Sequence, residues 1–269
     1  MKKYLFPIIF FFTLVSCEKV IDLDLEFTEK RIVVDAKINK HISKKDGYAK
    51  VIISETSSYF DNEINFIENA KVVIKELSTN NEYELKYLKE NHYYTEIDNI
   101  LDNSEYELNI FHNNNHYRSK ETLTNSPPIT SVKQGERESL NDEEIEIITT
   151  FTDLKNEENY YLFEFGEGNL QPARDLYING NEFSFSYFIN KKKIKNNELN
   201  IKMEGVDFDY FKFMIQIVIQ TNTQNGPFST APSSIKGNIY CVNNEDLNPF
   251  GYFKVCEFDT YTLKDINID

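Results

Sequence analysis

Residues 30–122 repeat a short alternation of apolar and polar positions. Tyr106, Leu108 and Ile110, for example, alternate with Glu107 and Asn109. Such a period of two is typical of strands that bury one face and wet the other. Seven segments share it, at residues 31–38, 47–54, 70–75, 82–87, 93–97, 105–110 and 117–119. Short strands separated by polar turns predict an antiparallel, immunoglobulin-like β-sandwich over residues 30–122.

Residues 123–129 interrupt this pattern. Pro127 and Pro128 lack the backbone N–H that a ladder needs, and they favour an extended connector. We therefore expect residues 123–129 to be a linker and residues 130–269 to form a second, β-rich domain.

The second half predicts fewer strands and one helix. Strand patterns occupy residues 144–151, 160–165, 182–188 and 198–203, and the tail segments 234–241 and 251–258 are expected to pair across a polar loop. Residues 207–220 place apolar side chains at helical and at strand spacing equally well. We expect a helix there, because Asp207 can cap it and acidic residues in the first turn favour its dipole.

The N-terminus has the order of a secretory leader. Lys2 and Lys3 precede an apolar run from Tyr4 to Val15, and Ser16 and Cys17 end it. The run is shorter than the about 20 residues that span a bilayer, and it fits the apolar part of a signal peptide. A buried N-terminal helix, or a plain signal peptide with a chance cysteine, is the alternative.

The last four residues of that leader, Leu-Val-Ser-Cys, are similar to a bacterial lipobox, in which the cysteine is acylated and becomes the new N-terminus. We expect residues 1–16 to be the signal peptide, Cys17 to carry the lipid and residues 17–29 to be a tether. Several acyl chains bury enough methylenes to anchor a protein firmly, whereas one chain holds it only marginally.

Composition narrows the partners. The formal net charge is −15, so the phosphates of nucleic acids repel the chain and we expect no nucleic-acid partner. Anionic lipid surfaces repel it as well, so the lipid anchor must provide any membrane contact. Aromatic residues make up 14% of the chain, all of them Tyr or Phe, which suits strands.

Few residues offer chemistry. His112 and His116 have the spacing of a helical metal pair, but they flank a predicted turn, so we expect no metal site. The acidic loops 61–63 and 243–246 lack the full calcium pattern and are expected to be solvated. Lys191–Lys193 is expected to be an exposed turn.

Catalytic motifs are also missing from the sequence. It contains no Gly-x-Ser-x-Gly, P-loop or dinucleotide-binding pattern, and nothing selects an acid–base pair. We expect no catalytic residues and no cofactor. Tyr59 and Phe60 are expected to pack the base of the sandwich, although loop aromatics could also contact a partner or a sugar face.

Cys241 and Cys256 could form a disulfide in an exported chain, and two buried free thiols are the competing possibility. A type I turn at 248–251 would place the two cysteines diagonally across the predicted strand pair. Diagonal neighbours lie about 7–8 Å apart, slightly too far for a disulfide. The sequence leaves both possibilities open.

Several segments together resemble a known family. They are "CEKVIDLDLE", "RIVVDAKIN", "TSSYFDNE", "NAKVVI", "YELNIF", "NYYLFEF", "PFSTAPSSIKGNIY" and "NPFGYF". They resemble bacterial outer-membrane lipoproteins of unknown function that accompany TonB-dependent receptors. The resemblance is most specific at Gly237-Asn238-Ile239, at Gly251-Tyr252-Phe253 and where the lipobox leads into Ile21-Asp22-Leu23. It implies a transthyretin-like first domain, an outer-membrane setting and no catalytic or binding residues.

We therefore expect a lipid-anchored protein of the cell envelope that acts as a non-catalytic accessory or binding partner of a TonB-dependent receptor. The alternatives are a surface hydrolase acting on polymers and a structural adhesin. A docking patch is expected on the second domain, whose Phe- and Tyr-rich segments exceed the needs of one half-buried sheet.

Overall fold

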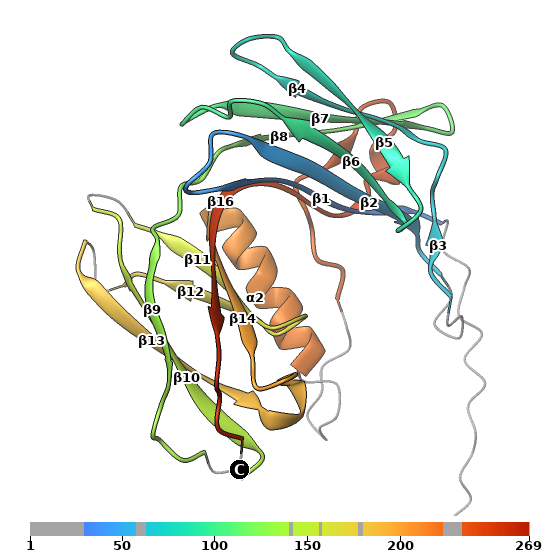
Figure 1. The fold of residues 1–269 in the computed structure, drawn as a ribbon. Helices are drawn as coiled ribbons and strands as arrows, with labels where there is room; N and C mark the ends of the chain where they lie inside the picture. Colours follow the sequence, from blue (N-terminus) through green and yellow to red (C-terminus); the bar gives the residue numbers. More distant parts are fainter. Residues whose placement is uncertain are drawn as a thin grey trace, which may run out of the picture.

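The structure, a computed structural model, describes residues 30–57, 63–139, 142–155, 158–176, 180–222 and 233–268. It is mainly β, with a β-sandwich followed by a second β-rich unit that carries helix α2 (Figure 1). The predicted fold class is confirmed.

The sandwich contains all seven strands predicted from the alternation, together with the two-residue strand β3. Its strands are β1 (Ile32–His41), β2 (Gly47–Glu55), β3 (Asn65–Phe66), β4 (Lys71–Glu76), β5 (Glu82–Leu88), β6 (His92–Ile97), β7 (Glu105–His112) and β8 (Asn115–Thr122). One layer runs β1-β2-β6 and the other runs β4-β7-β8, and β5 joins them by pairing with both β6 and β4. Val34, Ile38, Ile74 and Leu108 belong to the shared core.

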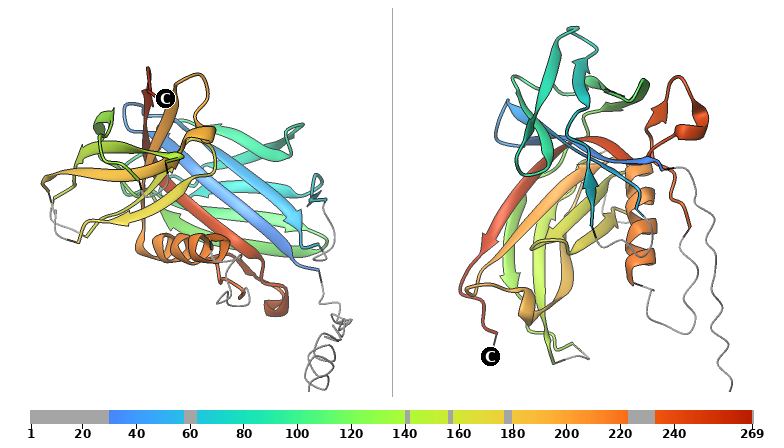
Figure 2. Two further views of the ribbon diagram at one scale, coloured as in Figure 1. Left: turned by 90° about the horizontal axis from the view of Figure 1, so that it is seen from below. Right: turned by 90° about the vertical axis from the view of Figure 1, so that its right-hand side faces the viewer.

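The second unit has three layers. Its strands are β9 (Ile129–Gln134), β10 (Glu144–Thr152), β11 (Tyr160–Phe165), β12 (Leu170–Arg174), β13 (Glu182–Asn190) and β14 (Leu199–Val206). A sheet of order β13-β10-β9 packs on the sheet that contains β12, β11 and β14, and α2 (Phe208–Asn222) covers the far face of the latter (Figure 2). The predicted helix is confirmed, and Asp207 caps it by accepting from the Tyr210 N–H at 2.8 Å.

Strand β16 (Phe250–Leu263) links the two units. Its first part pairs in parallel with β1, and its last part pairs antiparallel with β14. Figures 1 and 2 show β16, in red, running from the sandwich into the second unit. Phe253 and Val255 therefore lie in the sandwich core, although sequence reasoning had placed all of residues 130–269 in the second domain.

The expected pairing of segments 234–241 and 251–258 is wrong. Strand β15 (Tyr240–Cys241) pairs with β8 instead, and the chain only crosses β16 at Gly237. A Cβ on Gly237 would lie 1.5 Å from the Gly251 carbonyl oxygen, so the crossing requires glycine. Asn238 replaces the ladder locally: its side chain donates to the Phe253 carbonyl at 2.7 Å and accepts from the Phe253 N–H at 2.8 Å.

The predicted linker is extended but not free. Thr124 donates to the Val255 carbonyl at 3.0 Å and accepts from the Glu257 N–H at 2.9 Å. The Ile129 N–H donates to Asp259 at 2.8 Å. Residues 123–129 thus run along β16, and they add a further connection between the units.

Candidate binding site at the hairpin end of the sandwich

The β7–β8 hairpin ends in a tight asparagine turn. Asn113 and Asn114 have φ angles of 47° and 63°, and His112 pairs with Asn115 on either side of them. Positive φ at both central residues is the geometry of a type I′ turn, which matches the twist of paired strands. Asparagine adopts this left-handed backbone more readily than most residues, so the sequence Asn113-Asn114 specifies the turn.

His112 and His116 lie on opposite faces of this hairpin. His116 pairs with Phe111, and the two rings stack on the outer face with centroids 4.4 Å apart and planes 17° apart. Because side chains alternate along a strand, His112 points to the other face. The two imidazoles do not converge, and no group of three His, Cys, Asp or Glu suited to a metal ion occurs in the described parts of the chain.

His116 is held in one orientation. Its Nε2 lies 2.8 Å from Asn109 Oδ1, while Asn109 Nδ2 donates to Glu107 at 3.1 Å. This amide orientation requires the proton on Nε2, so Nδ1 is left as an acceptor. Burial lowers the pKa of His116, and the charge of Arg118 lowers it further against the pull of Glu107. The ring is therefore neutral at pH 7.

Asn243 clamps the hairpin from the other end of the sequence. Its side chain accepts from the His116 N–H at 3.0 Å and donates to the Asn114 carbonyl at 3.0 Å. No local pattern predicts this role, because Asn243 lies in one of the acidic loops expected to be solvated. The clamp fixes the turn although it comes from a residue more than a hundred positions away.

A cavity of about 350 Å³ opens at the turn. Its wall consists of Asn69, Phe111, His112, Asn113, Asn114, Asn115 and His116. The volume is at the lower end of the range of small-molecule sites. Burial also lowers the pKa of His112, so this lining carries no charged side chain at neutral pH.

Three large apolar side chains near the turn are open to solvent. Phe111, Tyr240 and Val242 are 43–47% exposed. Tyr240 is the register partner of Arg118, and the Val242 N–H donates to the His116 carbonyl at 2.7 Å. We call Phe111, Tyr240 and Val242 the hairpin face.

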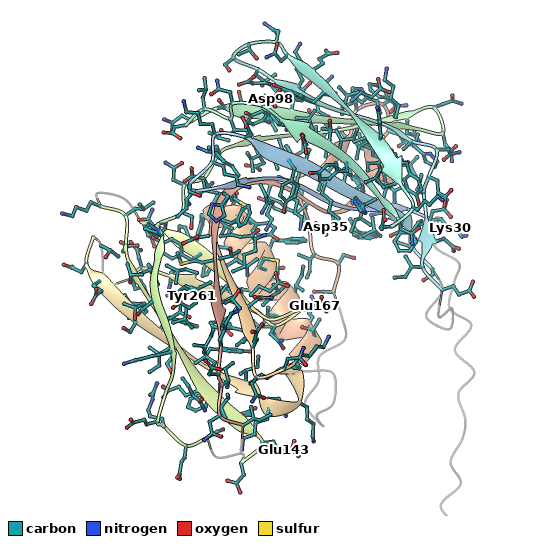
Figure 3. All side chains as sticks on the ribbon, viewed as in Figure 1. Lys30, Asp35, Asp98, Glu143, Glu167 and Tyr261 are labelled. Carbon is teal, nitrogen blue, oxygen red and sulfur yellow. The ribbon has the colours of Figure 1, made fainter. Side chains whose placement is uncertain are left out.

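The hairpin end lies where the described chain begins. Lys30, the first described residue, is ion-paired with Glu55 at 3.5 Å, and the charge of Glu55 acts on the pKa of His112. Figure 3 labels Lys30 at the end of the sandwich that carries β3 in Figure 1. Lys30 therefore lies at the same end of the sandwich as the asparagine turn.

A second polar cluster lies where the two units meet, and it is closed. Glu204 on β14 accepts from Asn39 Nδ2 at 2.7 Å, from Lys202 at 2.5 Å and from Lys254. Lys254 also lies 4.8 Å above the ring of Tyr210 on α2. We call Glu204, Asn39, Lys202, Lys254 and Tyr210 the joint. Asp35 lies on the same face of β1 as Asn39, towards α2 (Figure 3).

The charges of the joint are fixed. Burial alone would raise the pKa of Glu204, but Lys254 and Lys202 outweigh it and hold the pKa well below the usual range. Burial would lower the pKa of Lys254, yet Glu204 holds it well above 10.5. Groups locked in their charged forms cannot exchange protons near neutral pH, so the joint is suited to holding the units together rather than to acid–base chemistry.

One carboxyl near the joint is different. Glu121 on β8 accepts from Asn238 Nδ2 at 2.6 Å and lies near the acidic start of α2. Burial, and then the charge of Asp207, raise the pKa of Glu121 to about 7. It is therefore only partly ionised at neutral pH.

The two cysteines are free and buried. Cys241 on β15 faces the sandwich core, whereas Cys256 lies on the opposite face of β16 from Phe253 and Val255. The sheet therefore separates them, and both are free thiols in the structure. Burial raises the pKa of Cys256 to about 12, which leaves it as an unreactive thiol.

The aromatic segments of the second domain, where the sequence predicts a docking patch, mostly pack inside the unit, although Phe183 is 37% exposed. Phe185 and Tyr187 stack on Phe163 and Phe165 at centroid distances of 5.0 and 4.5 Å. This ladder fills the space between the two sheets of the unit. The sequence showed an apparent aromatic surplus because it did not reveal that a second sheet covers the first.

The remaining sequence candidates are readily placed. Lys191–Lys193 forms a short 3-10 turn with no buried residue, as expected, and Asn244 caps a second 3-10 turn, Glu245–Leu247. Cys17, Tyr59, Phe60 and residues 61–62 lie outside the described residues. None of the described helices is long and apolar enough to cross a membrane.

The chain belongs to a family of unknown function: the family model described as "Domain of unknown function (DUF4249)" matches residues 18–262. No curated protein matches the chain.

Solved structures resemble the chain only weakly. A DUF4785 family protein from Legionella pneumophila is 11% identical, with a TM-score of 0.23 over 67% of this chain and 54% of that one. The FN1–FN3 domains of chicken CNTN1 are 13% identical, with a TM-score of 0.18 over 63% of this chain and 58% of theirs. The chain thus spans little more than half of either structure.

Proposed function

We propose that this protein is a lipid-anchored, non-catalytic accessory of a TonB-dependent outer-membrane receptor, and that the hairpin end of the sandwich is its binding end. The observation that carries the proposal is the position of the hairpin face. The exposed side chains of Phe111, Tyr240 and Val242 lie at the end where the chain enters the sandwich at Lys30.

A tether from Cys17 sets the reach of that end. Twelve residues, 18–29, separate Cys17 from Lys30, and a fully extended chain covers about 3.5 Å per residue, so Lys30 stays within about 45 Å of the membrane surface. Confinement of this kind raises the effective concentration of a membrane partner, and a modest apolar surface then suffices for docking. The hairpin face has the required composition, because apolar groups at its centre border His116, Arg118 and asparagine amides.

The joint supports a non-catalytic role. Its buried ionisable groups are bonded to one another and fixed in charge, which keeps the two units in one arrangement. The rigid body then presents the hairpin face at a constant height and angle to the membrane.

Lipidation is tested first. The Cys17→Ser chain should lose incorporation of radiolabelled palmitate and leave the membrane fraction, while the wild-type chain keeps both. Equal labelling of the two chains would overturn the anchor.

Docking is tested by affinity purification of the tagged chain from outer membranes after mild crosslinking. The wild-type chain should recover a large barrel protein of the TonB-dependent receptor class. The double variant Tyr240→Ser/Val242→Ser should recover much less, and Phe183→Ser, at an exposed aromatic of the second unit, should recover as much as the wild type. Failure to recover a barrel, together with polymer hydrolysis by the purified chain, would replace the proposal with the enzyme alternative.

A further inference from the structure

The cavity at the asparagine turn differs chemically from the rest of the surface. Charged residues make up 27% of the chain, yet none of the seven lining residues is Asp, Glu, Lys or Arg. Its two histidines have lowered pKa values and are neutral at pH 7. The nearest charged groups, among them Arg118 and Glu107 beside His116, lie outside the lining, so the lining itself favours an uncharged ligand.

The polar groups of the cavity are mainly amides. Asn69, Asn113, Asn114 and Asn115 line it, and amide side chains carry both donors and acceptors, although Asn115 Oδ1 already accepts from Asn243 Nδ2 at 3.4 Å. His116 adds the Nδ1 acceptor, because its Nε2 is committed to Asn109. A ligand matched to this set carries groups that donate and accept together, which is the property of a hydroxyl.

One wall of the cavity is aromatic. Phe111 is 43% exposed, and its stacking partner His116 holds its ring in place. A fixed aromatic ring offers a flat apolar surface of low conformational entropy, against which a ring with an apolar face can pack. A pyranose sugar combines both features that this cavity favours, because its hydroxyl groups lie around the edge of the ring and its C–H groups form an apolar face.

The cavity is also preformed. The turn is fixed by the backbone geometry of Asn113 and Asn114 and by the two hydrogen bonds of Asn243, so little ordering is needed when a ligand arrives. We propose that this cavity binds one or two units of a neutral saccharide, with Phe111 as the stacking platform and the turn asparagines as hydroxyl partners.

This inference rests on the proposed role of the hairpin end in binding, and it names the ligand class. Carbohydrate would then lie next to the docking face and beside the membrane. The protein would hold a sugar ligand at the receptor that it accompanies.

The test is isothermal titration of the purified full-length chain in a detergent without a sugar headgroup. The probes are four neutral oligosaccharides, maltohexaose, cellohexaose, laminarihexaose and mannohexaose, with oligogalacturonate as an acidic comparison. At least one neutral probe should bind, and oligogalacturonate should bind less tightly than that probe. Binding of no neutral probe at millimolar concentration, or preference for the acidic one, overturns the inference.

Two variants locate the site. Phe111→Ala should weaken binding at least about tenfold, since tenfold corresponds to about 1.4 kcal/mol and exposed aromatic anchors contribute this much or more. The double variant Asn113→Gly/Asn114→Gly removes two amide side chains, and glycine tolerates the positive φ of the turn. This variant should therefore fold normally but bind the saccharide more weakly than the wild type. Phe183→Ala is the matched control and should bind normally. Wild-type affinity in both cavity variants overturns the assignment.

The inference and the proposed function fail separately. If the wild-type chain binds no sugar but still recovers the barrel protein, only the ligand class is overturned. If the wild-type chain binds a sugar, Phe111→Ala does not, and no barrel protein is recovered, the saccharide site stands and the proposed receptor partner is overturned.

Discussion

The joint and the hairpin end are both polar clusters with aromatic neighbours, but they use their hydrogen bonds in opposite ways. In the joint, Glu204 is buried and bonds to Asn39, Lys202 and Lys254, so its partners all come from the protein. At the hairpin end, the turn asparagines line an open cavity. In the joint the charged groups are satisfied within the protein, whereas at the hairpin end the turn asparagines and the exposed ring of Phe111 border solvent and remain available for a partner.

Removing the carboxylate of the joint should have the largest effect on stability. Glu204→Ala leaves Lys254 buried without its partner, and the loss of one member of a buried pair costs about 3–5 kcal/mol. Urea denaturation should show this loss, while Glu198→Ala, which removes an exposed pair with Lys264, should change the free energy of unfolding by less than about 0.5 kcal/mol. Equal effects of the two variants would remove the distinction between joint and surface.

The Glu204 carboxylate should also make the free energy of unfolding depend on pH in the acid range. The folded-state pKa of Glu204 lies below its unfolded value, so its contribution is complete above the unfolded pKa of about 4.3 and is lost as the pH falls towards the folded pKa. The wild-type protein should therefore lose more stability between pH 5 and pH 3 than Glu204→Gln does. A parallel decline in both proteins would contradict the assignment.

The clamp of the hairpin should have an intermediate effect. Asn243→Ala removes its bonds to the His116 N–H and the Asn114 carbonyl, which together contribute about 1–2 kcal/mol. Hydrogen exchange should become faster at residues 112–116 and stay unchanged in β14. Asp246→Ala, at an exposed position nearby, should leave both regions unchanged, and fast exchange in that control would show that the loop, not the clamp, orders the turn.

Glu121 should give an effect of opposite sign to that of Glu204. Its pKa is raised to about 7, so its ionisation destabilises the fold as the pH rises from about 4.5 to above 7. Glu121→Gln keeps an acceptor for Asn238 and should be more stable than the wild type by about 1 kcal/mol at pH 8, after solvent screening is allowed for. At pH 4 the two proteins should unfold at the same denaturant concentration, and a difference that persists there would point to packing instead of charge.

Reduction should not change the stability of the protein, because no disulfide joins Cys241 and Cys256 in the structure. Because Cys241 and Cys256 lie on opposite sides of β16, a reducing agent should leave the midpoint of thermal unfolding unchanged. The intact mass should correspond to two free thiols, and alkylation should be slow until the protein unfolds. A mass lower by two hydrogen atoms would contradict this arrangement.

Local patterns determined much of this fold. The alternation in residues 30–122 specified seven strands, and Asp207 correctly predicted the start of α2. The strands that were missed are those with weak local signals. Strand β3 has two residues, β12 contains Pro172 and lies at a sheet edge where proline is tolerated, and β9 begins inside the proline-rich segment.

Tertiary structure decided what the pattern of residues left open. A period of two shows which side chains share a face, but not which strand lies alongside, so it missed the parallel pairing of β16 with β1 and the crossing at Gly237. Burial of the second unit's aromatic segments depended on a sheet from elsewhere in the chain. Neighbouring residues alone determined the asparagine turn and the separation of His112 from His116, because both follow from local backbone geometry. Only the folded chain brought Asn243 to that turn and Asn39 to Glu204, since each contact joins residues more than a hundred positions apart whose meeting depends on the packing of whole strands.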